Sequence, residues 1–351
     1  MRVLFIDPKC PSPYQWDTLR SGGLGGTEAT VLRVARALAE MHEVSVLQHN
    51  RFRGHDEHGV RFLPGSSFDT AARGADHIIF IGKAQGINAI PSAVKARFWL
   101  WLHNFLGDEV PFFWADHLRR RLGIICVSKT HALHTQQFIR RQPQFLLTGG
   151  MIGRGKVTFI HNPLAGDLRP DPSVVRARHK LIFFSSPHKG IEQVVESFCY
   201  VRAHDPRFEL HVADPGYNKN VDLRVLDVPG VVRLGSLPHG ELISQVRSSL
   251  CVFYPQHKRP ETFGLVYAEA NAIGVPVLAH RFGSAEEVLS SEDQLVDGRD
   301  ARAVLERVSA WAGGSEPVVF GRPEFEMTNV ARRWRHLLDD PDAALARVDG
   351  S

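Results

Sequence analysis

Residues 259–280 read RPETFGLVYAEANAIGVPVLAH, and this stretch predicts a loop, a helix and a buried strand in that order. Prolines keep the preceding loop from being helical, and Thr262 is a good cap for a helix running from about residue 263 to 273. Gly274 and Pro276 then end that helix. The pattern therefore predicts a short helix that leads directly into a buried strand.

Two glutamates flank the start of this helix. Glu261 lies just ahead of it and Glu269 a turn and a half inside it, so the rise of a helix places their carboxylates about 12 Å apart. Between them, the amides of Phe263, Gly264 and Leu265 are donors of a helix N-terminus, which favours a phosphate. We interpret this as a clamp for a nucleotide sugar, whose hydroxyls donate to the carboxylates. The alternative is a solvated acidic helix end.

The same alternation of elements extends along the whole chain. Short apolar runs bounded by Gly, Pro and Asp alternate with helical patterns, which is typical of parallel sheets covered by helices. In the first half, strands are predicted near residues 3–6, 44–48, 77–81, 98–102, 124–127 and 157–160. The pattern restarts with KLIFFSS at residue 180. We therefore predict an α/β protein of two doubly wound domains, whose strand ends face one ligand across a cleft.

A charged segment with several prolines separates the two halves. We assign residues 1–165 to an N-terminal domain, 166–178 to a linker and 179–325 to a C-terminal domain. Residues 326–351 contain a last helix that can cross back to the first domain. Its apolar residues recur at helical spacing: Val330, Ala331, Trp334, Leu337 and Leu338.

Composition narrows the class of protein. A chain of 351 residues with 43% hydrophobic content can bury a large core, and its formal charge of +4 suits an anionic ligand but not a dedicated nucleic-acid binder. The four cysteines show no CxxC pairing, so we expect reduced core residues. The chain enters a strand directly after Met1, without a leader or an apolar run of about 20 residues. These features predict a cytoplasmic protein, soluble or peripheral to the inner face of the membrane.

A glycine-rich loop follows the first strand. Gly22, Gly23, Gly25 and Gly26 allow the backbone to approach a ligand, and the helix that begins near Thr27 supplies amide donors. The loop is neither GxGxxG nor a Walker loop. Since a first strand-to-helix turn lies at the ligand edge of such a sheet, we favour a ligand loop over a flexible surface loop.

Lys189 and His103 occupy comparable positions elsewhere. Lys189 and Gly190 lie in the first turn of the second domain, FFSSPHKGIEQ, where an ammonium group can meet a diphosphate. A lysine there opposes the helix dipole, which favours a functional role. His103 ends the strand FWLWLH and is a candidate to contact the reacting sugar, although a lone histidine is more often structural. No set of histidines has metal-ligand spacing, so we predict no structural or catalytic metal. We also predict no cofactor.

Taken together, these segments resemble the retaining glycosyltransferases of family 4, which have the GT-B fold of two Rossmann-like domains. The resemblance covers nearly the whole chain. Its motifs follow in family order: GGTEATVLRVARALAE, LWLH, CVSKTH, VTFIHNPL, SSPHKGIEQVVESF, VVRLGSLP and ETFGLVYAEANAIGVPVLAH. The resemblance implies a metal-independent enzyme that transfers a sugar from a nucleotide diphosphate donor to an acceptor hydroxyl with retention, the leaving phosphate helping to take the acceptor proton.

The resemblance also implies roles for the residues around the helix start. Glu269 would hold the ribose hydroxyls and Glu261 the donor sugar hydroxyls. The amides of Phe263, Gly264 and Leu265 would bind the diphosphate or the sugar. These residues would form most of the donor site in the second domain.

Other roles implied by the resemblance involve both domains. Lys189 would bind the diphosphate as a cation, and the backbone near Leu237 would meet the base. Gly25 and Gly26 would approach the diphosphate or the acceptor, and His103 would face the sugar. The residues expected to act in catalysis are Glu261, His103 and Lys189.

One position departs from the family pattern. Many members carry an arginine about five residues before the lysine, and here Phe184 stands there with Ser185 and Ser186 beside it. We include Ser186 among the donor-binding residues. Lys189 would then carry more of the charge, or Arg259 may take the place of the missing arginine.

Three alternatives remain open at this point. The chain could be a nucleotide-sugar epimerase of the same fold, a phosphorylase, or a non-catalytic protein that binds a nucleotide sugar or a glycan. The sugar, the acceptor and the base (UDP, GDP or ADP type) are not identified. The stretch VPFFWADHLRRRLG, residues 110–123, could contact an anionic membrane through its arginines, the alternative being solvated arginines over buried aromatic residues.

Overall fold

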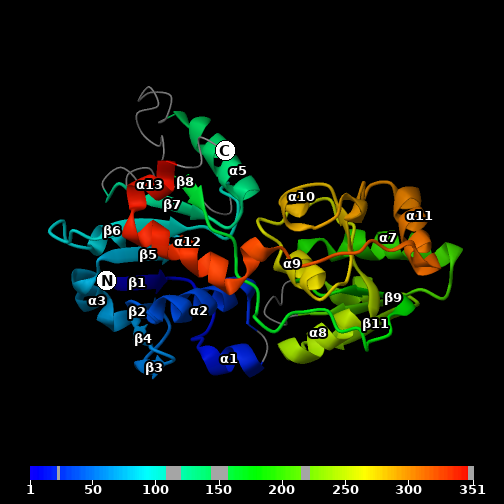
Figure 1. The fold of residues 1–351 in the computed structure, drawn as a ribbon, viewed down its shortest axis with the longest axis horizontal. Helices are drawn as coiled ribbons and strands as arrows, with labels where there is room; N and C mark the ends of the chain where they lie inside the picture. Colours follow the sequence, from blue (N-terminus) through cyan, green and yellow to red (C-terminus); the bar gives the residue numbers. More distant parts are fainter. Residues whose placement is uncertain (22–23, 108–119, 144–156, 215–221, 347–351) are drawn as a thin grey trace. The chain divides into compact units, whose positions relative to one another are not determined.

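The computed structural model describes residues 1–21, 24–107, 120–143, 157–214 and 222–346 (Figure 1). The chain divides into two compact units, each described by itself. The first comprises Met1–Trp16, Thr27–Pro163 and Glu326–Ser351, and the second comprises Asp17–Gly26 and Leu164–Phe325.

The first unit is built on a sheet of the order β3-β4-β2-β1-β5-β6-β7-β8. All neighbouring strands are parallel except β3, which is antiparallel to β4. The strands are β1 (Arg2–Asp7), β2 (Glu43–Gln48), β3 (His55–Glu57), β4 (Val60–Pro64), β5 (His77–Ile81), β6 (Arg97–Trp101), β7 (Gly123–Cys126) and β8 (Val157–Phe159). Because the order reverses at β1, between β2 and β5, the sheet is doubly wound.

Helices of the first unit include two from the end of the chain. They are α2 (Gly26–Ala39), α3 (Phe68–Gly74), α5 (Lys129–Arg140), α12 (Met327–Asp339) and α13 (Pro341–Ala346). On α12, the Trp334 ring lies 4.7 Å from that of Trp101 on β6 and 6.0 Å from that of Phe5 on β1. All three rings are fully buried, so α12 completes the core of this unit.

The second unit contains a parallel sheet of the order β11-β10-β9-β12-β13-β14. Its strands are β9 (Ala177–Phe183), β10 (Glu209–Ala213), β11 (Val231–Gly235), β12 (Ser249–Tyr254), β13 (Val277–His280) and β14 (Leu295–Val296). Its helices are α1 (Trp16–Ser21), α7 (Ile191–His204), α8 (His239–Arg247), α9 (Leu265–Ala272), α10 (Ala285–Val288) and α11 (Ala301–Ala310). In order along the chain the strands run 3-2-1-4-5-6, the Rossmann arrangement, so ligands are expected beyond the carboxyl ends of β9 and β12.

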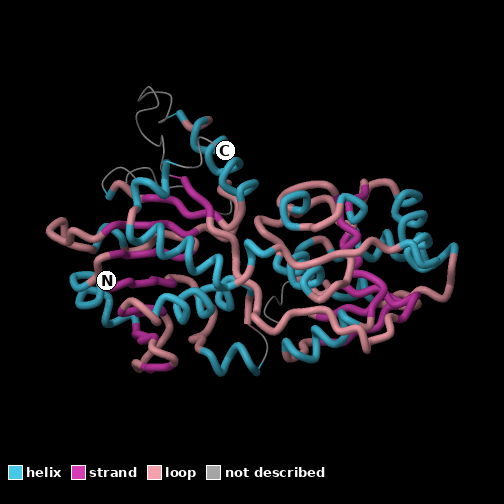
Figure 2. The backbone as a smooth tube through the Cα atoms, viewed as in Figure 1, coloured by secondary structure: helices cyan, strands magenta, loops and turns pink. Residues whose placement is uncertain are grey.

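The prediction of two doubly wound α/β domains is therefore confirmed (Figure 2). The six strands predicted in the first half are all present, each within a residue or two of its predicted bounds. The strands β3 and β4, which enclose a tight turn at His58 and Gly59 with φ of 50° and 78°, were not predicted. The C-terminal helix buries the five apolar residues predicted for it.

Several local predictions were wrong. Thr262 does not cap a helix, because Gly264 precedes α9 in a left-handed conformation with φ of 77° and the helix begins at Leu265. The loop predicted between the first strand and the helix near Thr27 contains α1. Three cysteines are buried as expected, but Cys199 is exposed on α7.

None of the described helices is both long enough and apolar enough to cross a bilayer. Most of the stretch considered for membrane contact lies outside the described residues. Of its arginines, Arg120 lies over the Phe98 ring at 5.3 Å and donates to the Pro91 carbonyl, 3.4 Å away.

Candidate functional site

The carboxyl ends of β9 and β12 lie side by side at the point where the order of the second sheet reverses. The last residues of these strands, Phe183 and Tyr254, stack with their ring centroids 5.5 Å apart. The loop after β9 carries Lys189, and the loop after β12 carries Glu261. Ligand-binding groups therefore lie where a Rossmann sheet presents them.

Glu261 joins these two loops through both oxygens of its carboxylate. Lys189 Nζ donates to Oε2 at 2.7 Å, and the Tyr254 hydroxyl donates to Oε1 at 2.8 Å. Glu261 is only 5% exposed, so these partners compensate for removing the charge from water. The prediction from sequence placed Lys189 and Glu261 in one site, and the structure brings them into contact.

The backbone around Glu261 is fixed by two neighbouring segments. Gln256, which is fully buried, donates through Nε2 to the Arg259 carbonyl at 2.7 Å and accepts from the Arg259 amide at 3.0 Å. On the other side, the Ser284 amide donates to the Glu261 carbonyl at 3.1 Å. Gly283 has φ of 58°, and a Cβ there would lie 2.8 Å from the same carbonyl oxygen. The carboxylate is therefore held by a rigid loop.

The start of α9 depends on Gly264. A Cβ at this position would lie 2.6 Å from the Tyr267 ring, and its positive φ is unfavourable for other residues. Within the described parts of the chain, the amides of Gly264 and Leu265 have no acceptor. They point out of the positive end of the helix, where negative charge is favoured. Gly26 belongs to the same unit, and a Cβ there would lie 2.9 Å from Leu265 Cδ1.

Glu269 lies further along α9 and is 7% exposed. Its Oε1 is 3.2 Å from Nε2 of His239, the first residue of α8. Leu237 is half-buried in the loop just ahead of that residue. The histidine was not predicted, since nothing in the sequence indicates that a residue thirty positions upstream faces Glu269.

The turn around Lys189 also differs from a simple helix start. Residues Pro187–Lys189 form one 3-10 turn, and α7 begins only after Gly190, which has φ of 93°. Ser186 is buried, with its hydroxyl 2.6 Å from His188 Nδ1. Phe184 is 6% exposed, so the place of the family arginine is filled by a buried ring. Arg259 is exposed in the loop closed by Gln256.

Buried hydroxyls surround the Glu261 carboxylate. Burial raises the pKa of Tyr254 well above its usual value, and the charge of Glu261 raises it further. The same two causes raise the pKa of Tyr267. Tyr254 therefore remains a hydrogen-bond donor at all physiological pH values, and it was also missed from the sequence.

His103, Gly25 and the buried Phe263 complete the predicted residues. His103 lies after β6 in the first unit, 9% exposed, with its ring 4.7 Å from that of Trp101. Burial, followed by the charge of His131, lowers its pKa to about 3, so the imidazole is neutral at pH 7. Gly25 belongs to the second unit. Gly22 and Gly23 lie outside the described residues.

The described residues contain no group of three or more His, Cys, Asp or Glu side chains arranged to hold a metal ion. The chemistry available at the second sheet is that of carboxylates, an ammonium group, hydroxyls and helix amides.

Part of the second unit matches a known protein family. Residues 180–316 match the family model of the group 1 glycosyl transferases. This segment contains Lys189, His239, Tyr254, Glu261 and Glu269.

Two curated relatives match about a third of the chain. A phosphatidyl-myo-inositol mannosyltransferase of Propionibacterium freudenreichii is 34% identical over 122 residues, which are 34% of this chain and 30% of the relative. A GDP-mannose-dependent monoacylated alpha-(1-6)-phosphatidylinositol monomannoside mannosyltransferase of Corynebacterium glutamicum is 30% identical over 128 residues, 34% of each chain. The match therefore spans about a third of the length of each relative.

A solved structure matches over the full chain. An Anabaena protein in complex with UDP and glucose has a TM-score of 0.61 at 17% identity, covering 97% of this chain and 99% of its own. At this identity the likeness concerns the fold. The chain thus has the two Rossmann-like domains of the GT-B fold, and its residues 180–316 are similar to group 1 glycosyl transferases.

Proposed function

We propose that the protein is a retaining, metal-independent glycosyltransferase that moves a sugar from a nucleotide diphosphate sugar to an acceptor hydroxyl. The observation that carries this proposal is the buried Glu261 carboxylate, bonded to Lys189 and Tyr254 beside the start of α9. It lies at the ligand edge of a Rossmann sheet, in the segment that matches the glycosyl transferase family.

The donor nucleotide would be bound along α9. Glu269 accepts hydrogen bonds from the ribose hydroxyls, and His239 holds its carboxylate in place. The amides of Gly264 and Leu265 donate to the diphosphate, where the helix dipole favours negative charge. The reaction needs no cofactor, since the nucleotide sugar is the donor substrate.

Lys189 would gain a second partner when the donor binds. Its ammonium group carries three donors, of which one bonds Glu261, so it can reach a diphosphate oxygen while keeping that contact. Glu261 then accepts a hydroxyl of the donor sugar. Together with the helix amides, Lys189 neutralises the charge that develops on the leaving diphosphate without requiring a metal ion.

The transfer itself would use the leaving group as its base. The bond between the anomeric carbon and the diphosphate oxygen breaks, and the released oxygen accepts the proton of the acceptor hydroxyl. The acceptor oxygen forms its bond to the same face of the sugar, which retains the configuration. His103, neutral at pH 7, would face the sugar as a hydrogen-bonding group and not as a cation.

The relatives suggest where to begin the search for substrates. One of them is named as GDP-mannose-dependent and both are named as mannosyltransferases acting on phosphatidylinositol compounds. GDP-mannose is therefore the first donor to test, followed by UDP- and ADP-sugars. A lipid-linked acceptor would place the protein at the inner face of the membrane.

The proposal can be tested with purified protein and a panel of UDP-, GDP- and ADP-sugars, with and without EDTA. We expect one base to bind, and binding to weaken at least tenfold in Glu269→Ala and Lys189→Ala. Product NMR should show the anomeric configuration of the donor. Donor isomerisation without an acceptor would indicate an epimerase, and binding without turnover a non-catalytic protein. Unchanged donor affinity in both variants would refute the site.

A further inference from the structure

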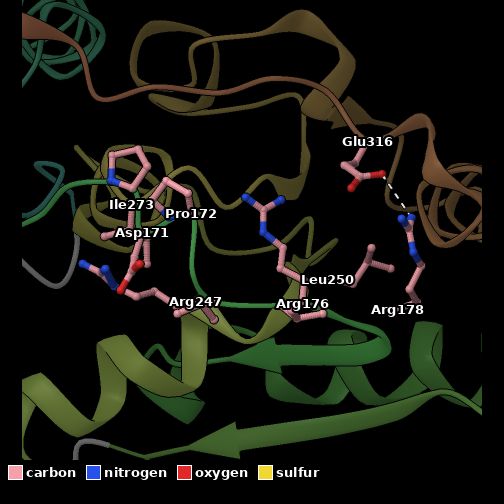
Figure 3. A pocket seen from close by; sticks show the side chains of 11 residues that line it. Asp171, Pro172, Arg176, Arg178, Arg247, Leu250, Ile273 and Glu316 are labelled. Atoms are coloured by element: carbon pink, nitrogen blue, oxygen red, sulfur yellow. Dashed lines mark ion pairs between the residues drawn. The ribbon is translucent and has the colours of Figure 1, made fainter.

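A cavity lies in the second unit, away from the proposed donor site (Figure 3). It has a volume of about 420 Å³, within the usual range for small-molecule pockets. Three arginines, Arg176, Arg178 and Arg247, line it together with two acidic residues, Asp171 and Glu316. Apolar side chains, including Val174, Leu250 and Ile273, form much of the remaining wall. The combination of several guanidinium groups and an apolar wall is typical of a site for an organic anion.

The cavity is at the opposite end of the sheet from Glu261. Arg176 and Arg178 lie at the start of β9, whose first residue pairs with the first residue of β12. Arg247 is the last residue of α8, and Ile273 follows the end of α9. Because the strands are parallel, these residues gather at the amino edge, whereas the donor loops leave the carboxyl edge.

The charges in the cavity are only partly compensated. Arg178 forms an ion pair with Glu316 at 3.6 Å, the contact marked by the dashed line in Figure 3. Arg176 donates to the carbonyl of Gly274, and it forms no ion pair with any described residue. Burial lowers the pKa of Arg176, and the charge of Glu316 acts in the opposite direction. Arg247 likewise forms no ion pair within the described part of the chain.

One oxygen of the Glu316 carboxylate lacks a hydrogen bond among the described residues. Its Oε2 atom is buried and has no hydrogen-bond partner in the described parts of the structure, although it is the oxygen nearest Arg178. A buried carboxylate oxygen without a hydrogen bond is destabilising, because the free energy lost on removing it from water is not regained. Arg176 and Arg178 are two residues apart, and in Figure 3 their side chains extend in the same direction from the start of β9. Both arginines line the cavity.

We propose that this cavity binds a small phosphomonoester, whose phosphate bonds Arg176 and Arg178 in place of Glu316 and whose organic part lies on Val174 and Leu250. A phosphate accepts paired hydrogen bonds from guanidinium groups, which the Glu316 carboxylate does not. Arg247 adds positive charge from the other side of the cavity. This site does not depend on the proposed function, because it shares no residue with the donor site.

The test uses the full chain carrying Lys189→Ala, so that phosphate groups bind less well at the donor site. Inorganic phosphate, glycerol 3-phosphate and glucose 6-phosphate are titrated by calorimetry, with glucose as the uncharged control. We expect an organic phosphomonoester to bind, glucose not to bind, and Arg176→Gln to weaken binding about tenfold or more. If no phosphomonoester binds, or if Arg176→Gln leaves the affinity unchanged, the arginines only stabilise the helix ends.

A second variant separates the site from effects on folding. Glu316→Gln removes the competing carboxylate and should tighten phosphomonoester binding several-fold. Glu306→Gln, which removes an exposed partner of Arg302 on α11, makes the same charge change outside the cavity and should leave the affinity unchanged. Weaker or unchanged binding in Glu316→Gln, or equal tightening in both variants, would overturn the proposal.

Discussion

At the scale of single residues, the two buried tyrosines near Glu261 differ in one respect. The Tyr254 hydroxyl bonds the Glu261 carboxylate, whereas the Tyr267 hydroxyl is buried without a hydrogen-bond partner among the described residues. We expect Tyr254→Phe to lower the free energy of unfolding by about 1.5–3 kcal/mol and to weaken donor binding, since a hydrogen bond to a charged group is lost. The matched variant Tyr267→Phe should be neutral or slightly stabilising. Urea unfolding and donor titration measure both, and equal losses would contradict this assignment.

His103 leads to a prediction about pH. Its pKa is lowered to about 3 in the folded protein, mainly by burial, against about 6.5 in the unfolded chain. Between these values the unfolded state binds more protons, so this residue makes the free energy of unfolding fall as the pH drops from about 6.5 towards 3. We expect His103→Gln to reduce that slope in urea unfolding measured from pH 4 to 7. An identical pH dependence in the variant would show that His103 is not buried in its neutral form.

At the scale of elements, a substitution of Gly264 tests how α9 begins. Gly264→Ala would place a Cβ 2.6 Å from the Tyr267 ring at a φ of 77°, so we expect a loss of about 1–3 kcal/mol and weaker donor binding. Gly240, the second residue of α8, has open space around its Cα, and Gly240→Ala should be neutral or stabilising by up to about 1 kcal/mol. Thermal unfolding and donor affinity compare the two. A Gly264→Ala variant as stable as Gly240→Ala would refute this account of the helix start.

The elements also show what the sequence could reveal. The strands of the first half and the helix at residues 327–339 were predicted because their apolar residues recur with a clear period. The strand β3 consists of three polar residues and has no apolar pattern. The start of α9 depends on a left-handed glycine and not on the side chain of Thr262. In the site, Lys189 and Glu261 were predicted from local motifs. His239 was missed because its contact with Glu269 forms only when two separate helices pack together.

At the scale of the whole molecule, the chain ends in the unit where it begins. The buried Trp334 on α12 packs against Phe5 and Trp101, so α12 contributes to the core of the first unit although it follows the whole second unit in sequence. We expect Trp334→Ala to lower the stability of the first unit by about 3–5 kcal/mol, since a large buried ring is lost. Hydrogen exchange should show lower protection in β1 and β6 and unchanged protection in β9 and β12. Val318→Ala, at a position 91% exposed in the second unit, is the control and should change neither. Equal loss of protection in both sheets of the Trp334→Ala variant would mean that the two units unfold as one, and would contradict the assignment of α12 to a separate core.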